Sequence, residues 1–99
     1  MKIDEKVYKK LLQVPTGKVT TYSELAKAVG LKDGQRIIGK IMNKNPYPVI
    51  VPCHRVVKAN GEVGGYAFGE DVKISMLLKE GIEIKNKKIF ELKKRTYRF

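Results

Sequence analysis

The chain has one cysteine, one histidine and no tryptophan among its 99 residues. A single cysteine cannot form an internal disulfide. One cysteine and one histidine cannot supply the four Cys/His ligands of a structural zinc site, so we expect no metal. The lack of a second thiol also means that a covalent adduct on Cys53 could not be released by disulfide exchange within the chain. If Cys53 reacts, it reacts once.

Long apolar segments are also missing. No run of 18 apolar residues occurs, and the opening residues Met-Lys-Ile-Asp-Glu-Lys do not contain the apolar stretch of a signal peptide. We therefore expect a cytoplasmic protein that does not associate with membranes. The length of 99 residues fits one small domain spanning residues 1–99, which buries about 60 to 65% of its unfolded surface.

Acidic residues are scarce relative to basic ones. Ten Asp and Glu stand against 21 Lys and Arg, which leaves a formal net charge of +11. Such a charge on a small domain favours a polyanionic partner, and nucleic acid is the first candidate. The alternative is a lysine-rich solvated surface of the kind common in thermophiles.

The two rare residues are neighbours in the segment Pro52-Cys53-His54-Arg55. A thiol attacks as its thiolate, and a nearby imidazole or cation favours that form. The segment therefore predicts an activated nucleophile. The alternative is a buried structural cysteine beside a surface histidine, because free cysteine is among the most buried residue types.

Capping signals predict three helices in the first half of the chain. Asp4 is expected to cap a helix over residues 5–12. Thr21-Tyr22-Ser23-Glu24 has the form of a capping box, and Gly30 would close the short helix that follows. With a third helix over residues 33–44, the pattern indicates a helix-turn-helix at about residues 22–44.

The third predicted helix carries a basic stripe. Arg36, Lys40 and Lys44 recur at four-residue intervals, and the opposite face is expected to hold Ile37, Ile38 and Ile41. Such a stripe suits phosphates or a DNA groove. The alternative is a solvated face on a helix that only packs against the core.

The second half predicts short elements around the cysteine. A stiff, proline-rich connection leads from Asn45 into an active-site segment over residues 45–67. A short hairpin is expected from Val56-Val57 to Glu62-Val63, with its turn at Asn60-Gly61, and a second hairpin over residues 82–92 around Asn86-Lys87. Between them we expect a helix over residues 71–80 that is capped by Asp71 and has Val72, Ser75, Met76 and Leu77 or Leu78 facing inward. The basic tail over residues 93–99 is expected to fray. The predicted fold is mainly α (α+β), a winged-helix-like single domain with short hairpins.

Several of these segments together resemble a known family. They are Thr21-Tyr22, Arg36-x-x-Gly39, Asn45-Pro46-x-Pro48, Ile50-Val51-Pro52-Cys53-His54-Arg55-Val56, Gly64-Gly65-Tyr66 and Lys73-x-x-x-Leu77-Leu78-x-Glu80-Gly81. In this order they are similar to the C-terminal domain of the O6-alkylguanine-DNA alkyltransferases, over roughly residues 5 to 82. Members of that family flip a damaged guanine out of the duplex and take its alkyl group irreversibly onto cysteine, without a cofactor.

The resemblance implies a role for each matching residue. Cys53 would accept the alkyl group, His54 would activate it through a water, Glu80 would hold the imidazole, and Asn45 would pin the backbone before the Cys53 segment. The partner would be double-stranded DNA containing O6-alkylguanine, bound by a monomer that can cluster on DNA. The remaining DNA- and base-binding positions implied by the motifs and the stripe are Tyr22, Arg36, Gly39, Lys40, Val56, Tyr66, Ala67 and Lys73.

Among these, the resemblance assigns specific tasks. Arg36 would fill the space of the extruded nucleotide, and Tyr22 would rotate the adjoining phosphate. The backbone of Val56 and Ala67, with Tyr66, would line the guanine pocket. Lys73 would support the pocket loop.

The chain departs from the family pattern in two ways. The family's N-terminal domain is missing, as in the alkyltransferase-like proteins, which bind the lesion without repairing it. Those proteins generally carry another residue, often Trp, where this chain has Cys53, so the cysteine favours transfer. Ala67 stands where glycine or a small hydroxylated residue is common, and its backbone amide remains. The two alternatives are a lesion-binding protein with little or no transfer and a helix-turn-helix regulator with an incidental thiol.

Overall fold

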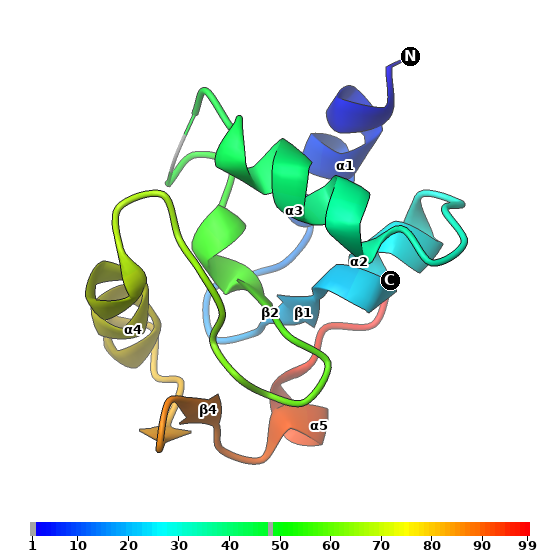
Figure 1. Ribbon diagram of the computed structural model, residues 1–99. Helices are drawn as coiled ribbons and strands as arrows, with labels where there is room; N and C mark the ends of the chain where they lie inside the picture. Colours follow the sequence, from blue (N-terminus) through cyan, green and yellow to red (C-terminus); the bar gives the residue numbers. More distant parts are fainter. Residues whose placement is uncertain (1, 48) are drawn as a thin grey trace.

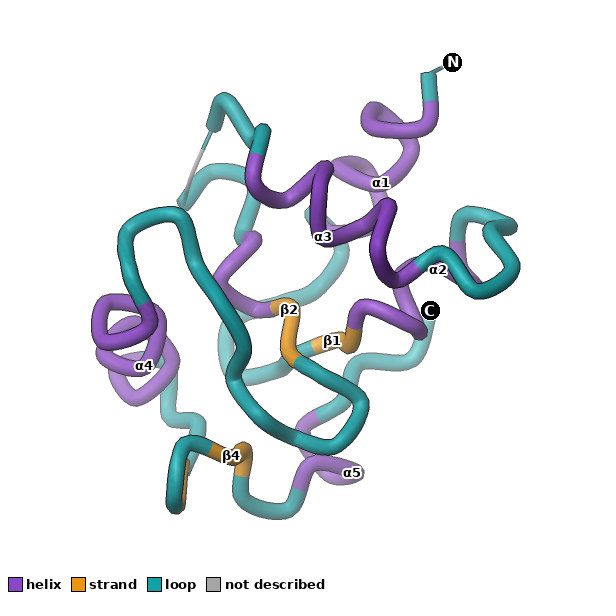
Figure 2. The backbone as a smooth tube through the Cα atoms, viewed as in Figure 1, coloured by secondary structure: helices purple, strands orange, loops and turns teal. Residues whose placement is uncertain are grey.

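The computed structural model describes residues 2–47 and 49–99, so Pro48 of the Asn45-Pro46-x-Pro48 motif lies outside the described residues. Helices dominate, with short strands between them (Figures 1 and 2). In chain order the elements are α1 (Ile3–Leu11), β1 (Thr20–Thr21), α2 (Tyr22–Ala28), α3 (Gln35–Asn43), the 3-10 helix η1 (Cys53–Arg55), β2 (Val56–Val57), α4 (Glu70–Lys79), β3 (Ile84–Lys85), β4 (Lys88–Ile89) and α5 (Leu92–Arg95). Among the described residues, no helix is both long enough and apolar enough to cross a bilayer.

The predicted helix-turn-helix is confirmed. α2 begins where expected because the Thr21 hydroxyl accepts a hydrogen bond from the backbone N–H of Glu24 at 3.1 Å. The chain leaves α2 through Gly30, whose φ of 81° suits glycine. α3 follows and crosses α2 at the front of the molecule (Figure 1). It spans Gln35–Asn43, slightly less than the predicted 33–44.

Two details of these helices differ from the sequence prediction. α1 begins at Ile3 after Lys2, and Asp4 lies inside its first turn instead of capping it. An acidic residue there still interacts favourably with the helix dipole. On α3, Ile38, Ile41 and Met42 are buried, but Ile37 is 46% exposed and does not belong to the inward face.

The buried side chains form two clusters. The first joins the helix-turn-helix to the cysteine segment and contains Val7, Leu11, Val14, Leu25, Ala26, Ile38, Ile41, Met42, Val51, Cys53 and Val56. The second lies among α4, the β3–β4 hairpin and β1, and contains Val19, Val57, Val63, Leu77, Ile82 and Ile89. β2 connects them, because its two valines contribute one side chain to each cluster.

The hairpin predicted from Val56-Val57 to Glu62-Val63 is wrong as a strand pair. β2 instead pairs in parallel with β1, with Thr20 opposite Val56 and Thr21 opposite Val57. Both valines are fully buried, which suits a strand that is covered on both faces. The turn at Asn60-Gly61 does form, since the Lys58 N–H donates to Glu62 O at 2.9 Å, but the chain then runs toward the second hairpin.

That second hairpin is confirmed. β3 and β4 pair antiparallel, and the two turn residues Asn86 and Lys87 have φ values of 52° and 61°. Two consecutive positive φ values are typical of a tight two-residue hairpin turn. The Val63 N–H donates to Lys87 O at 3.0 Å, so this hairpin receives the segment that follows the Asn60-Gly61 turn.

The predicted inward face of α4 is confirmed at Leu77 but wrong at Val72 and Ser75. Its buried residues are Lys73 and Leu77, whereas Val72 is 43% exposed and Ser75 is exposed. The helix begins at Glu70 after Gly69, without a side-chain cap, so the predicted Asp71 cap is wrong. The apolar spacing misled the prediction because a lysine with backbone acceptors occupies an inward position.

The tail over residues 93–99 is anchored, so the prediction that it frays is wrong. Its first residues form α5, and the next ones run beside Val19. Val19 N–H donates to Arg95 O at 2.9 Å, and Tyr97 N–H donates to Val19 O at 2.8 Å. The Tyr97 ring also packs against the first core cluster. The tail therefore pairs with Val19, the residue directly before β1.

Candidate functional site

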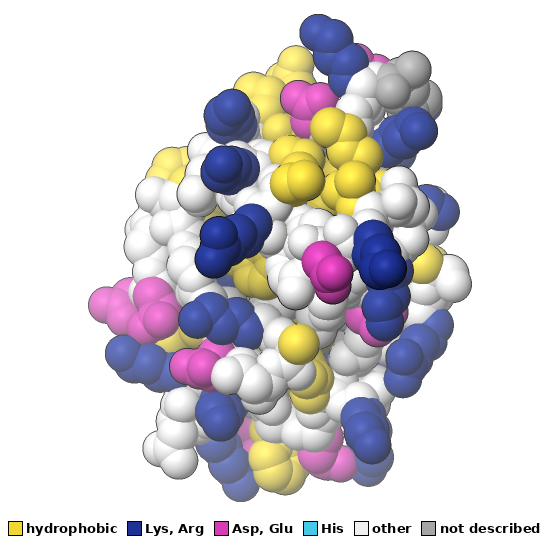
Figure 3. Space-filling model, turned by 45° about the vertical axis from the view of Figure 1, so that its right-hand side comes forward, with side chains coloured by type: hydrophobic (Ala, Val, Ile, Leu, Met, Phe, Trp, Pro, Cys, Tyr) yellow, Lys and Arg dark blue, Asp and Glu magenta, His cyan; other side chains and the backbone are white. Residues whose placement is uncertain are grey.

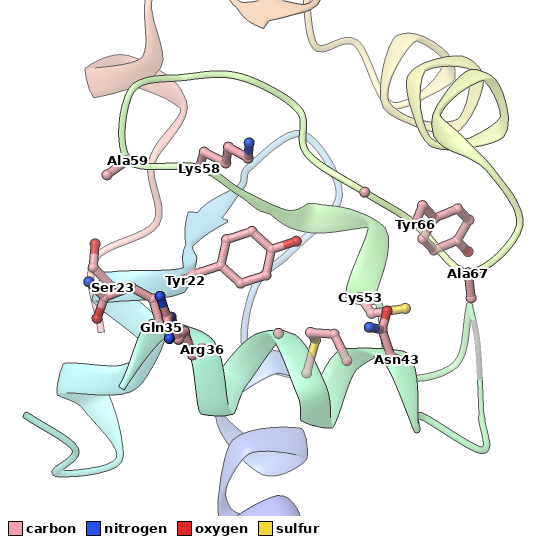
Figure 4. A pocket seen from close by; sticks show the side chains of 13 residues that line it. Tyr22, Ser23, Gln35, Arg36, Asn43, Cys53, Lys58, Ala59, Tyr66 and Ala67 are labelled. Carbon is pink, nitrogen blue, oxygen red and sulfur yellow. The ribbon is translucent and has the colours of Figure 1, made fainter. Parts of the chain in front are cut away.

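A cavity of about 540 Å³ opens between α3 and the loop that follows β2 (Figure 4). The helix-turn-helix supplies one wall, and the cysteine segment with the residues after it supplies the other. The lining residues are Tyr22, Ser23, Gln35, Arg36, Gly39, Met42, Asn43, Cys53, Lys58, Ala59, Gly65, Tyr66 and Ala67.

The two ends of the cavity differ in chemistry. Cys53 lies at one end, near Ala67, and the polar residues Gln35 and Arg36 lie at the other (Figure 4). η1 positions the cysteine, and Pro52 with φ of −80° precedes it directly. The thiol side chain is 6% exposed, so it is buried in the wall and still borders the cavity.

Behind the cysteine, His54 makes a defined contact with Glu80. The imidazole is buried, and its Nε2 lies 2.9 Å from Glu80 Oε2. A carboxylate can only accept, so this contact places the proton of the neutral imidazole on Nε2. Nδ1 then carries the lone pair, and this buried atom has no hydrogen-bond partner among the described residues. The imidazole is thus arranged as a proton acceptor.

The charge states of this pair follow from burial and from Arg55. Burial lowers the pKa of His54 below 6.5, although Glu80 acts in the opposite direction, so the imidazole is neutral at pH 7. Burial alone raises the pKa of Glu80, but the hydrogen bonds from Arg55 and His54 outweigh it and hold the pKa below 4.5. At neutral pH, Glu80 is therefore an ionised carboxylate beside the neutral imidazole of His54.

Arg55 is a site residue that the sequence interpretation did not assign. Its guanidinium donates hydrogen bonds to both carboxylate oxygens of Glu80, from Nε to Oε1 at 2.9 Å and from an Nη to Oε2 at 2.7 Å. It also donates to Val14 O at 2.8 Å and to Thr16 Oγ1 at 2.9 Å. Arg55 therefore ties the cysteine segment to the end of α4 and to the turn after α1. Its position next to His54 was the available signal.

Asn45 fixes the entrance to the cysteine segment. Its Nδ2 donates to Val51 O at 3.0 Å, and its Oδ1 accepts from the Tyr47 N–H at 3.0 Å. These contacts lie between α3 and η1, where the sequence interpretation placed a backbone-pinning role.

Lys73 is fully buried beside the cavity and is not among its lining residues. Its Nζ donates to Val56 O at 2.6 Å and to Gly65 O at 3.1 Å, and lies 5.9 Å from the centre of the Tyr22 ring. Burial lowers the pKa of Lys73 to about 8, while the charges of Cys53 and Glu70 oppose the change.

Two tyrosines border the cavity. Burial, followed by the charge of Cys53, raises the pKa of Tyr22 and of Tyr66 above 10, so both phenols keep their protons at neutral pH. The Tyr66 hydroxyl is buried without a hydrogen-bond partner among the described residues. It is therefore free to donate to a ligand. The exposed Phe68 packs edge-on against the Tyr66 ring, with 5.6 Å between centroids.

The remaining predicted positions divide between cavity and surface. Arg36, Gly39 and Ala67 line the cavity, and a Cβ placed on Gly39 would meet open space. Lys40 is exposed on α3 and does not line it. Val56 does not line it either, since its side chain is buried and its carbonyl is bonded to Lys73. Ser23, Gln35, Asn43 and Lys58 line it without any signal in the sequence.

One face of the molecule is rich in basic side chains (Figure 3). Lys and Arg side chains recur over the face shown in Figure 3, whereas Asp and Glu are fewer, and no histidine is visible there. Among the described residues, no group of three or more His, Cys, Asp and Glu side chains could hold a metal ion. A polyanion is the ligand that this surface favours.

Comparisons with known proteins agree on one family. The family model described as 6-O-methylguanine DNA methyltransferase, DNA binding domain, matches residues 2–82 of this chain. A methylated-DNA–protein-cysteine methyltransferase of Methanosarcina acetivorans is 45% identical over 75 residues, which cover 76% of this chain and 48% of that protein. The chain thus spans about half the length of this curated relative.

Solved structures give the same fold. Mycobacterium tuberculosis OGT in complex with DNA superimposes with a TM-score of 0.79 at 36% identity, covering 82% of this chain and 49% of that one. S. pombe Atl1, bound to damaged DNA containing O6-carboxymethylguanine, has a TM-score of 0.82 at 31% identity and covers 97% of this chain and 94% of that one. Similarity therefore extends both to longer proteins and to one of matching size.

Proposed function

Because the chain belongs to the family of the 6-O-methylguanine DNA methyltransferase DNA-binding domain, we propose that it repairs O6-alkylguanine in duplex DNA by transferring the alkyl group to Cys53. One observation carries the proposal: the thiol borders a base-sized cavity, and the adjacent His54 is held by Glu80 with a free nitrogen. The transfer is irreversible and occurs once per molecule.

DNA binding is assigned to α3 and its surroundings. Arg36 stands at one end of the cavity, the exposed Lys40 follows on the same helix, and the exposed Lys44 caps the C-terminal end of that helix. Relatives with this fold are found in complexes with DNA, one of them damaged. The cations supply contacts to phosphates, which act in any sequence context. This suits a protein that searches for a lesion instead of a sequence.

The cavity is the proposed site of the flipped base. Extruding a nucleotide costs a few kcal/mol of lost stacking and pairing, so a side chain must fill the gap that it leaves. Arg36 lies at the opposite end of the cavity from Cys53 and is the side chain we assign to this task. Tyr22 lies between them and is assigned to the adjoining phosphate.

The transfer step is a displacement at the alkyl carbon. His54 Nδ1 takes the thiol proton through a water, and the sulfur attacks the carbon bonded to O6. The S–C bond forms as the C–O6 bond breaks, and its electron pair goes to the guanine. Tyr66 donates a hydrogen bond to the leaving oxygen, and a proton returned to the base completes the exchange. No cofactor is consumed.

The second candidate is a lesion-binding protein without transfer. It is favoured by the similarity to Atl1 over nearly the whole of both chains. Cys53, placed in the cavity wall beside His54, favours transfer instead. A helix-turn-helix regulator remains the third candidate and requires sequence-specific binding.

Intact mass separates the three. The protein is incubated with duplex DNA carrying one O6-methylguanine, with undamaged duplex as the control. We expect the wild-type chain to gain one methyl group and Cys53→Ala to gain none while still preferring damaged DNA. If the protein prefers damaged DNA but gains no mass, the result supports the lesion-binding protein. If it prefers a DNA sequence and not the lesion, the result supports the helix-turn-helix regulator.

A further inference from the structure

Residues 83–99 form a basic segment beyond the part of the chain that the family model matches, which ends at residue 82. They hold the β3–β4 hairpin, α5 and the anchored tail. Seven of these residues are Lys or Arg and two are Glu, so the segment carries nearly half of the formal net charge of +11. The basic residues are Lys85, Lys87, Lys88, Lys93, Lys94, Arg95 and Arg98. The proposed function gives none of them a role.

Some of these cations are not neutralised by the fold. Three of them pair with carboxylates, namely Lys85 with Glu83, Lys87 with Glu70 and Lys94 with Glu91. Lys88 and Lys93 are exposed, and in the described part of the chain neither forms an ion pair. Like charges that lie close together repel one another, so these two do not stabilise the segment by themselves. Their charge is available to an external anion.

The hairpin is fixed to the edge of the cavity. Ile89 N–H donates to Gly61 O at 2.8 Å. Lys88 forms an antiparallel bridge with Glu62. Ala59, two residues before Gly61, lines the cavity. The backbone that carries Lys88 is therefore bonded to the turn that borders the cavity.

α5 packs on the same turn. Leu92 opens α5, and its Cδ2 lies 3.9 Å from the position that a Cβ on Gly61 would take. The Leu92 side chain also packs against the second core cluster. Lys93, the next residue, is exposed. Lys88 and Lys93 are thus held on two elements that both contact the turn at Asn60-Gly61.

The tail reaches α2, which borders the same end of the cavity. Arg98 lines a surface hollow together with Glu24, and the preceding residue Ser23 lines the cavity. Ser23, Arg36 and Ala59 lie at the end of the cavity away from the cysteine (Figure 4). Figure 3 shows Lys and Arg side chains also at the lower end of the molecule, where Figure 1 places the hairpin and α5. The basic segment therefore flanks the Arg36 end of the cavity.

We propose that residues 83–99 form a second DNA-binding surface, in which Lys88 and Lys93 contact phosphates of the duplex beside the flipped nucleotide. This rests on the proposed function, which places Arg36 in the duplex at this end of the cavity. Double-stranded DNA carries a negative charge about every 1.7 Å along its axis, so a duplex held there presents phosphates to the flanking surface. Such contacts fix the position of a protein on DNA without reading sequence. The second surface lengthens the footprint of the domain along the duplex.

The salt dependence of binding to undamaged duplex tests the surface without any transfer. The double variant Lys88→Gln/Lys93→Gln loses two charges and keeps long polar side chains. We expect the slope of log affinity against log salt concentration to fall by about 0.9 for each lost contact, or about 1.8 for both. Lys88→Arg/Lys93→Arg keeps both charges and should keep the wild-type slope. An unchanged slope in Lys88→Gln/Lys93→Gln would overturn the proposal.

A matched control removes two charges elsewhere. Lys6 and Lys9 are exposed on α1, which lies behind α3 in Figure 1. Lys6→Gln/Lys9→Gln changes the net charge by the same amount, and we expect it to keep the wild-type slope. Equal decreases in the two double variants would show that only net charge matters, and would also overturn the proposal.

Trimmed duplexes locate the second surface relative to the lesion. Cys53→Ala, which cannot accept an alkyl group, is bound to duplexes with one O6-methylguanine and a shortened flank on either side. Shortening one of the two flanks should weaken binding, and it should weaken binding less when Lys88→Gln/Lys93→Gln is added. Equal weakening with and without these two substitutions would contradict a contact to the flanking phosphates.

Intact mass distinguishes failure of this proposal from failure of the proposed function. If the wild-type protein gains a methyl group from damaged duplex but all variants share one salt slope, transfer stands and the second surface is wrong. If the slopes differ as expected but no methyl group is gained, the second surface stands and transfer fails. A wild-type chain that binds no duplex would overturn both.

Discussion

At the scale of single residues, Glu80 occupies a position that would be unfavourable without its partners. It caps the C-terminal end of α4, where the helix dipole disfavours an anion. Arg55 grips it with two hydrogen bonds, and His54 donates a third. The carboxylate is therefore both stabilised in place and available to fix the tautomer of His54.

Glu80→Gln is expected to slow alkyl transfer by about 10² to 10⁴-fold, the range typical of a lost acid–base group. The amide can donate as well as accept, so it no longer holds the imidazole proton on Nε2. The rate is measured by intact mass in single turnover. The control is Glu83→Gln, an exposed carboxylate 3.7 Å from Lys85. Wild-type rates in both Glu80→Gln and His54→Ala would remove the proposed relay.

The sequence drew attention to the two residues that we propose to react, but not to all the residues that hold them in place. Cys53 and His54 are the sole members of their types and stand side by side, which drew attention to both. Arg55 follows them, but its partners Val14 O and Thr16 belong to a turn far away in the sequence. Spacing along one segment carries no information about such contacts. Lys73 was assigned to the pocket loop by resemblance, whereas its complete burial emerged only from the fold.

At the scale of elements, local signals predicted well and long-range pairing did not. The Thr21 cap and the glycine at residue 30 mark α2 in the sequence as in the structure. β2 was placed in a hairpin because Asn60-Gly61 is a strong turn signal. The turn forms, but Val56 and Val57 pair with β1 because that arrangement buries both. Burial decides whether a strand pairs with a segment nearby or far away in the sequence, and a local sequence pattern gives no information about that burial.

α3 yields a prediction that separates two roles of Arg36. If it fills the space of the flipped base, Arg36→Ala lowers transfer from duplex DNA, while the free modified base reacts almost as before. Arg36→Lys rescues poorly, because lysine lacks the planar guanidinium. Lys40→Ala, which removes an exposed cation outside the cavity, should weaken binding to damaged and undamaged duplex alike. It should also lower the slope of log affinity against log salt concentration by about one unit. Equal losses of transfer rate on duplex DNA and on the free base would contradict this role and indicate that Arg36 only contacts phosphates.

The anchored tail gives a prediction about stability. Removing residues 96–99 deletes the Tyr97 N–H bond to Val19 and the packing of the Tyr97 ring on the first core cluster. We expect the free energy of unfolding to fall by about 1 to 3 kcal/mol. Urea unfolding measures it, with the exposed Arg98→Ala as the control. A truncated chain as stable as the intact one would show that the tail is only a surface appendage.

At the scale of the whole molecule, the site lies where the two core clusters meet. Val56 belongs to the first cluster and Val57 to the second, and η1 with Cys53 immediately precedes them. Lys73 and Glu80 reach the same region from α4. Cys53 therefore lies close to the boundary between the two core clusters.

Acid should destabilise the whole fold through His54 and Glu80. Both have a lower pKa in the fold than the ordinary values of 6.5 and 4.5, so the unfolded chain binds their protons first. Stability is thus lost as the pH falls below 6.5, and further as it falls below 4.5. Urea unfolding at pH 7, 5.5 and 4 measures the loss. In Glu80→Gln the dependence below pH 4.5 should flatten, and in Glu83→Gln it should persist.

The pairing of Val19 with residues 95–97 also governs how the protein can be made. Val19 leaves the ribosome early, but its backbone partners Arg95 and Tyr97 are among the last residues of this stretch to be synthesised. At about 5 to 20 residues per second, Val19 lacks these two backbone partners for several seconds during synthesis. During translation the helix-turn-helix can form, whereas the backbone hydrogen bonds of Val19 are completed only after residue 97 has emerged.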